Sequence, residues 1–146
     1  MPVKRIYIAT LLLYASVFAA CAGDNQNLAQ NSEDANDESK IAAAFTTRTS
    51  NIQVHGQGVV TRLLADDRSG SRHQRFIVRL GSGQTLLIAH NVDIAHRIDD
   101  LRTGDHIQFY GEYVWNAEGG TIHWTHHDPA GSHVTGWLKH NGQTYQ

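Results

Sequence analysis

The chain has 146 residues, of which 40% are hydrophobic and 18% charged, a length and composition typical of one soluble globular domain with an additional tail. Its formal net charge of -2 excludes a strong overall field of either sign, so charge alone gives no reason to expect a polyanionic partner. Because there is only 1 cysteine, no intrachain disulfide can hold the fold together.

The start of the chain has the pattern of an export signal. Two basic residues precede an uncharged apolar run that is shorter than the roughly 20 residues a membrane-spanning helix needs. We therefore interpret residues 1–20 as a lipoprotein signal peptide. Cys21 follows directly, so we expect it to be lipidated and to become the mature N-terminus. Ordinary cleavage after Ala22 is the alternative.

The expected location follows from this lipid. A lipid on Cys21 would hold the protein on a membrane, and because Ala22 stands where an Asp would retain a lipoprotein at the inner membrane, we expect the periplasmic face of the outer membrane. A soluble periplasmic or secreted protein is the alternative. No specific protein partner is indicated.

Two segments without domain character come next. Residues 21–38 are rich in Asn, Gln, Asp and Glu and almost free of aromatic and β-branched side chains, so we expect a flexible tether. Residues 39–50 are predicted to be a short helical lead-in, because Ile41, Ala44 and Phe45 fall on one side of a helix.

Residues 51–146 are predicted to form a small all-β domain. Alternating apolar and polar residues, separated by turn residues such as Gly, Asn and Asp, predict its strands. A helix is expected over residues 91–101, where three aliphatic side chains recur at helical spacing. Near the end, Asn141-Gly142 predicts a tight hairpin turn. The predicted strands cover residues 52–64, 73–80, 84–90, 106–115 and 121–127.

This order of elements favours a particular barrel. Three strands, a helix and two further strands resemble the OB-fold, a five-stranded barrel that binds oligonucleotides and oligosaccharides. We therefore predict an all-β fold with one short helix, a small five-stranded OB-fold-like β-barrel behind a signal peptide and a disordered tether. Gly56 and Gly58 agree with this, because glycines permit the sharp bend that barrel closure requires. Another small β-barrel or a sandwich is the alternative.

Histidine is unusually frequent, with 10 residues in the chain, and it binds metals and transfers protons. In the densest group, His123 and His127 would lie about 13 Å apart along one strand, too far to chelate one ion as a pair. No further cysteine is present to complete a structural zinc site. Local hydrogen bonding of His126 and Asp128 around the turn at Pro129 is the structural alternative. The candidate ligands for a divalent metal, zinc or manganese, are His90, Asp93, His126, His127 and Asp128.

In an OB-fold the loop between strands 1 and 2, the end of strand 3 and the loop between strands 4 and 5 gather at one end of the barrel. We expect the polar and aromatic side chains of these segments to meet there. Each also has a structural interpretation as a polar turn, a solvated strand face or core packing. The expected cluster consists of Asp66, Asp67, His73, Arg75, His90, Asn91, Asp93, Glu112, Trp115 and His123.

Such a mixture suits two functions. In a binding cleft, Trp115 and Tyr113 would stack a sugar or base while polar side chains fix hydroxyls or phosphate. In a hydrolytic site, His90 and a nearby Asp would hold a metal ion that activates water. The candidates for ligand binding are Arg75, Asn91, Glu112, Tyr113 and Trp115. The candidates for catalysis are His73, Arg75, His90, Asn91 and His123.

Four stretches of the chain resemble an uncharacterised family of small exported bacterial proteins, and the resemblance covers most of residues 51–146. That family has no assigned activity, so the resemblance implies membership and no mechanism. His96 stands where the family has Pro and Val114 where it has an acidic residue, so the resemblance supports no role for His96. The stretches are residues 73–76 (HQRF), 82–91 (SGQTLLIAHN), 111–113 (GEY) and 123–129 (HWTHHDP).

The sequence thus favours a non-enzymatic binding module of the cell envelope, whose ligand is a glycan or another extended polar molecule, with nucleic acid as the second candidate. The alternative is a metal-dependent hydrolase of the phosphodiesterase or nuclease type. A third hypothesis is a structural envelope protein whose histidines respond to pH or bind metal loosely.

Overall fold

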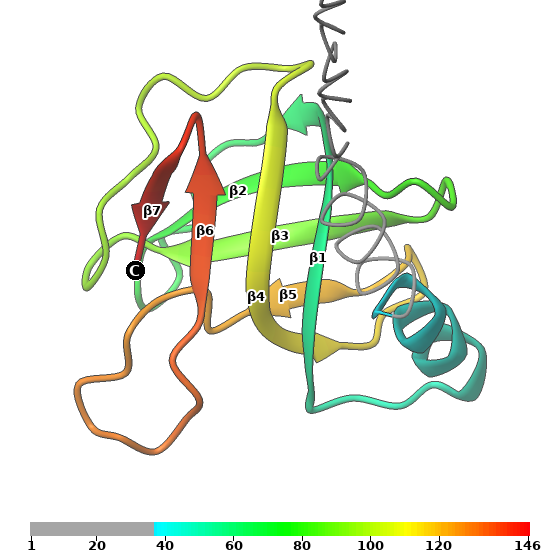
Figure 1. The fold of residues 1–146 in the computed structure, drawn as a ribbon. Coiled ribbons are helices and arrows are strands. Elements are labelled where there is room, and N and C mark those ends of the chain that lie inside the picture. The colour runs from blue at the N-terminus through cyan, green and yellow to red at the C-terminus, as the bar shows by residue number, and fades with distance from the viewer. Residues whose placement is uncertain (1–36) are drawn as a thin grey trace, which may run out of the picture.

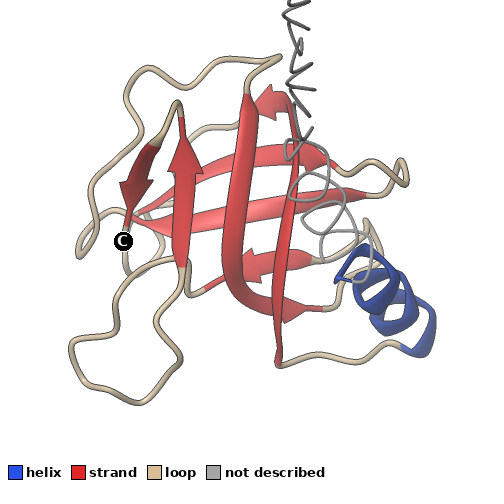
Figure 2. Cartoon of the chain, viewed as in Figure 1, coloured by secondary structure: helices blue, strands red, loops and turns tan. Residues whose placement is uncertain are grey.

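The computed structural model describes residues 37–146, which form a β-barrel with one helix (Figures 1 and 2). The predicted signal peptide, Cys21 and most of the predicted tether lie outside these residues. Within the described part of the chain, no helix is long and apolar enough to cross a membrane.

Five strands close into a barrel. The sheet runs in the order β1-β2-β3-β5-β4, and β1 also pairs with β4, which closes the ring. Only the β3–β5 pairing in this ring is parallel. The five-stranded barrel predicted from the sequence is therefore confirmed. The strands are β1 (Ile52–Leu63), β2 (His73–Arg79), β3 (Thr85–Asn91), β4 (His106–Val114) and β5 (Thr121–His123), followed by β6 (Trp137–His140) and β7 (Gln143–Tyr145).

The hairpin β6–β7 is attached to the barrel through β4, which pairs with β6. Its turn is formed by Asn141 and Gly142, with φ of 49° and 78°. Positive φ at both central residues is what the twist of a two-residue hairpin requires, and Asn-Gly meets it at little cost. The turn predicted from these two residues is confirmed.

The barrel interior is filled by the apolar residues of the alternating pattern. Phe76, Phe109 and Leu138 are each 0% exposed. The glycines of β1 make room for them: a Cβ at Gly56 would lie 2.6 Å from the Phe109 ring, and one at Gly58 would meet the backbone oxygen of Arg79. These glycines are therefore needed for the close approach of β1 to its neighbours.

One helix, residues 37–47, packs against the barrel, and its Ile41 and Ala44 belong to the core. The helix is fastened by hydrogen bonds at its start. The two carboxylate oxygens of Glu38 accept from the backbone N–H groups of Gly81 and Ser82, at 2.9 and 2.8 Å. The helix therefore contacts the β2–β3 turn as well as the core.

The helix predicted over residues 91–101 is wrong, because this segment forms turns. The side chain of Gln74 explains the difference. Its amide donates to the backbone oxygen of Ile98 at 2.8 Å and accepts from the backbone N–H of the same residue at 2.9 Å. A helix would use these backbone groups internally, whereas here a buried glutamine of β2 satisfies them.

The fifth strand is shorter than predicted, since it ends at His123. Trp124 adopts φ of 52°, which takes the chain out of the extended conformation. The alternation is thereby shifted: strict alternation from the buried Ile122 would turn Trp124 inward and Thr125 outward, but Thr125 is 0% exposed and Trp124 is partly exposed.

Candidate ligand-binding face

The outer surface of β4 lies in the middle of a continuous polar and aromatic face. Strand β1 flanks it on one side, and β5 and β6 flank it on the other (Figure 1). Cross-strand register places outward side chains of this face in three rows, whose members are all at least partly exposed and none of them aliphatic. We call this face the outer grid. Its rows are Gln53, Glu112 and His123; His55, Tyr110 and Trp137; and Gln57, Gln108 and Lys139.

The middle row of the outer grid is aromatic. The ring centroid of Trp137 lies 5.6 Å from that of His55 and 6.2 Å from that of Tyr110. The ammonium of Lys139 lies 4.5 Å from the centre of the Trp137 ring. The face of an indole ring is electron-rich, so it attracts a cation and can also stack on the C–H surface of a sugar.

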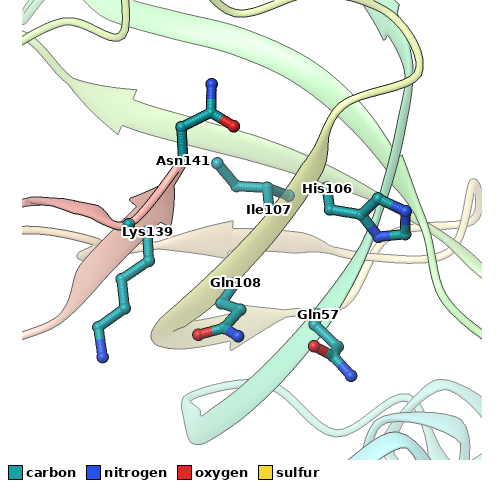
Figure 3. A pocket seen from close by; sticks show the side chains of 7 residues that line it. Gln57, His106, Ile107, Gln108, Lys139 and Asn141 are labelled. Atoms are coloured by element: carbon teal, nitrogen blue, oxygen red, sulfur yellow. The ribbon is translucent and has the colours of Figure 1, made fainter.

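The third row borders a hollow of about 320 Å³. Gln57, Gln108 and Lys139 line it together with the turn residues Asn141 and Gly142. Figure 3 shows these three side chains extending from adjacent strands on the same side of the sheet. Amide groups both donate and accept hydrogen bonds, so this row suits a ligand rich in hydroxyl groups.

The first row continues into the loop between β5 and β6. The Nδ1 of His133 lies 3.9 Å from an oxygen of Glu112, and its ring stacks on Trp124 with centroids 3.5 Å apart. A positive φ at a residue as bulky as Trp124 costs energy, and strain of this kind is found most often at functional sites. The structure thus presents a second partly exposed indole beside the outer grid.

His90, a candidate for both catalysis and metal binding, has both ring nitrogens occupied. Its Nε2 faces the backbone oxygen of His96 at 3.1 Å and must donate, while its Nδ1 lies 2.8 Å from the hydroxyl of Thr125 and accepts. The side chain is 0% exposed, and burial is the main cause that lowers its pKa to about 4. His90 is therefore neutral at pH 7 and has no lone pair free for a metal ion.

Two aromatic candidates lie away from the outer grid. Tyr113 is inside the barrel, 0% exposed, and its hydroxyl donates to the backbone oxygen of Gly119 at 3.2 Å. Trp115 lies against the helix, where its Nε1 donates to the backbone oxygen of Phe45 at 3.1 Å. The Arg48 guanidinium lies over its ring, 5.3 Å from the ring centroid. Both rings contribute to packing in the structure.

The candidates at the start of β2 and the end of β3, opposite the β2–β3 turn, hold loops together. Arg75 donates to the backbone oxygen of Ala65 at 3.0 Å. Asn91 accepts from the backbone N–H of Asp93 at 3.0 Å, and Asp93 accepts from that of Arg72 at 2.7 Å. His73 lies nearer the grid, because its ring centroid is 6.5 Å from that of His123. Burial, followed by the proximity of His73, lowers the pKa of His123.

The cluster at residues 126–128 organises the β5–β6 loop. Asp128 accepts from the backbone N–H groups of Ala130, Ser132 and His133. These hydrogen bonds lower the pKa of its carboxyl, and the bond from Ala130 has the largest effect. His126 is 3% exposed and donates to the backbone oxygen of His127. Within residues 37–146 no three His, Cys, Asp or Glu side chains form a group that could hold a metal ion.

Of the sequence candidates, the structure brings Glu112 and His123 together in the outer grid, with His73 beside His123. Asp67 and Asn91 pair with His73, so part of the expected cluster does meet at this end of the barrel, whereas Tyr113 and Trp115 lie elsewhere. Sequence reasoning missed the aromatic row and the amide row. The alternation along β1 and β4 marks their polar side as outward, but only the register of β4 with β1 and β6 assembles that side with Trp137 and Lys139.

Comparison with known proteins extends the sequence resemblance. Residues 25–146 match the model of a family described as "Protein of unknown function (DUF3465)". A search of curated proteins finds no match. The matched region includes the whole barrel, the helix and the β6–β7 hairpin. The chain therefore belongs to the family of proteins of unknown function DUF3465.

Proposed function

We propose that this protein is a non-enzymatic binding module that holds an extended polar ligand, a glycan, across the outer grid. The observation that carries the proposal is the combination of an aromatic row with an amide row on one exposed face. Aromatic rings stack on the apolar faces of sugar rings, while the neighbouring amides bond their hydroxyls. An ordinary solvated sheet face carries scattered charges and does not need aligned aromatic side chains.

The dimensions of the outer grid favour a chain over a single small solute. Neighbouring strands lie about 4.8 Å apart and alternate residues of a strand about 6.8 Å apart, so the face measures roughly 10 by 14 Å. Its surface is also open, with the hollow beside Gln108 leading past the β6–β7 turn. A linear ligand can therefore lie along the rows.

The charge of the outer grid favours a glycan over nucleic acid. Glu112 and Lys139 carry opposite charges and lie in different rows. Nucleic-acid binding depends on several basic groups that neutralise phosphates, and this face offers one. A ligand without a dense negative charge fits it better.

The remaining parts of the proposal come from the sequence. We infer an OB-type barrel from the order of the strands, and a lipid on Cys21 that places the domain at the periplasmic face of the outer membrane. A polysaccharide of the envelope would be within reach of a domain tethered there. The hydrolase alternative has no comparable support, since both nitrogens of His90 are bonded within the protein.

The test is a glycan array probed with the full chain, with single-stranded oligonucleotides as a separate arm. Trp137→Ala and Gln108→Ala are expected to weaken retention of the bound glycan by at least about tenfold, the loss of one stacked ring or of its hydrogen bonds. Arg79→Ala, an exposed change on β2 outside the outer grid, is the matched control and should bind like the wild type. Equal retention by Trp137→Ala and wild type, or retention of oligonucleotides alone, would overturn the proposal.

A further inference from the structure

The two charged groups of the outer grid lie at opposite ends of it. Glu112 is in the first row, where it pairs with His123 across the strands. Lys139 is in the third row, where it pairs with Gln108. Because alternate residues of a strand lie about 6.8 Å apart, these two rows are separated by about 14 Å. The face is therefore acidic at one end and basic at the other.

The hollow of about 320 Å³ beside the third row is lined by hydrogen-bond donors (Figure 3). Among the described residues that line it, none is acidic. Its polar side chains are one ammonium, one imidazole and three amides, and each of these groups can donate a hydrogen bond. They belong to Lys139, His106, Gln57, Gln108 and Asn141.

These donors are not used within the protein. Among residues 37–146, the side chains of His106, Asn141 and the two glutamines make no hydrogen bond or ion pair. The Lys139 ammonium has only the Trp137 ring as a partner there, 4.5 Å from its centre. A ring face leaves N–H groups of an ammonium free to donate. The hollow thus offers one positive charge without a counter-ion, together with several free donors.

We infer that the ligand of the outer grid is an acidic glycan, and that one carboxylate or sulfate ester of this glycan lies in the hollow against Lys139. The inference rests on the proposed function, because the neighbouring sugar rings must lie along the aromatic row. Hydrogen bonds between an ammonium and an anionic oxygen are about twice as strong as neutral ones. An ammonium is a compact charge on a flexible stem, so a carboxylate and a sulfate ester both fit it.

The separation of charge also gives the ligand a direction. An anionic group placed in the first row would face the carboxylate of Glu112, and juxtaposed like charges oppose binding. The same group placed in the third row meets Lys139. The acidic sugar unit therefore lies at the β6–β7 turn, and the rest of the chain extends toward β5.

The experiment compares glycans that differ only in charge. Each acidic glycan that an array retains with the full chain is compared with the same glycan after reduction of its carboxyl groups or removal of its sulfate. The wild type is expected to bind the charged form at least about tenfold more tightly, as one hydrogen bond to a charged group allows. This preference should shrink as salt is raised, because ions screen an exposed charge pair. Which treatment removes binding identifies the anion as carboxylate or sulfate.

Variants assign the preference to Lys139. Lys139→Gln removes the charge and should reduce the preference for the charged form by at least about tenfold, whereas Lys139→Arg keeps the charge and should retain the preference. Arg79→Gln is the matched control, because it removes one positive charge at an exposed position of β2 outside the outer grid. It should show the preference of the wild type.

The outcomes separate this inference from the proposed function. Equal binding of charged and uncharged forms, or retention of neutral glycans alone, would overturn the acidic ligand, while loss of that binding in Trp137→Ala would still support the face. A preference that survives Lys139→Gln would overturn the site in the hollow. If the array retains no glycan, the proposed function fails and this inference fails with it.

Discussion

The hydroxyl of Thr125 lies 2.8 Å from the Nδ1 of His90, and this bond joins the segment after β5 to the end of β3. The imidazole is held on its other side by the backbone oxygen of His96. A neutral ring satisfies both partners, with Nδ1 accepting from the hydroxyl. Protonation would make Nδ1 a donor to that hydroxyl and would place a charge in the core. The histidine that the sequence offers as a catalyst is, in the structure, a buried connector.

The stability of the domain should fall as pH is lowered from about 6.5 to 4. The pKa of His90 is lowered from 6.5 to about 4, so the unfolded chain binds this proton first. Stability from this group is complete above pH 6.5 and is lost as pH falls toward the folded pKa, a difference of about 3 kcal/mol at most. Urea unfolding measured at several pH values between 4 and 7 tests this.

The matched variant is His90→Gln, whose amide can keep both hydrogen bonds and does not titrate. Its unfolding free energy should depend less on pH than that of the wild type over the same range. His123, whose pKa is also lowered, contributes in the same direction and leaves a residual slope. A variant slope as steep as the wild-type slope would show that His90 is not the group responsible.

Ile41→Ala should destabilise the domain by about 2–5 kcal/mol, the usual cost of removing a buried aliphatic side chain. Ile41 is 0% exposed and belongs to the barrel core although it comes from the helix. Chemical denaturation would measure the change. Ala43→Ser, at an exposed position of the same helix, should change stability by no more than about 0.5 kcal/mol. Similar values for both variants would mean that the helix does not contribute to the core.

Gly136→Ala should displace the start of β6. A Cβ at Gly136 would overlap the backbone oxygens of Trp124 and Tyr110, and Tyr110 is held by its pairing with His55 and Trp137. The expected cost is about 1–3 kcal/mol or more. Backbone amide exchange should show faster exchange in β6.

The control for this change is Gly131→Ala in the same loop. A Cβ there meets open space, but φ is 67°, so only conformational strain of about 1 kcal/mol is expected. Exchange in β6 should be unchanged. Unaltered exchange in Gly136→Ala as well would contradict the close approach seen at the base of the loop.

Cys21→Ser should abolish lipid attachment. If the cysteine is acylated, cells fed with labelled palmitate will label the wild type and it will fractionate with membranes, because an acyl chain buries many methylene groups in the bilayer. The serine variant should remain unlabelled. No labelling of the wild type would instead favour ordinary cleavage after Ala22, and equal labelling of both proteins would show that the lipid is not on Cys21.

The sequence determined strands β1 to β4 to within a residue at each end, because alternation is a local property. In β2, Phe76 and Val78 point inward and Arg75 and Arg79 outward, as spacing alone indicates. The Asn-Gly turn is likewise local, since positive φ is a property of those residues. Closure of five strands followed from their number and order. These features need no knowledge of distant contacts.

Tertiary structure decided the rest, because it depends on groups far apart in the chain. Residues 91–101 have helical spacing, but the buried amide of Gln74 takes the backbone bonds of Ile98 and the segment forms turns. The outer grid exists only through register, which sets Tyr110 between His55 and Trp137. The sequence of a single strand sets which side chains share a face, whereas the pairing register of the strands sets which side chains of neighbouring strands lie beside them.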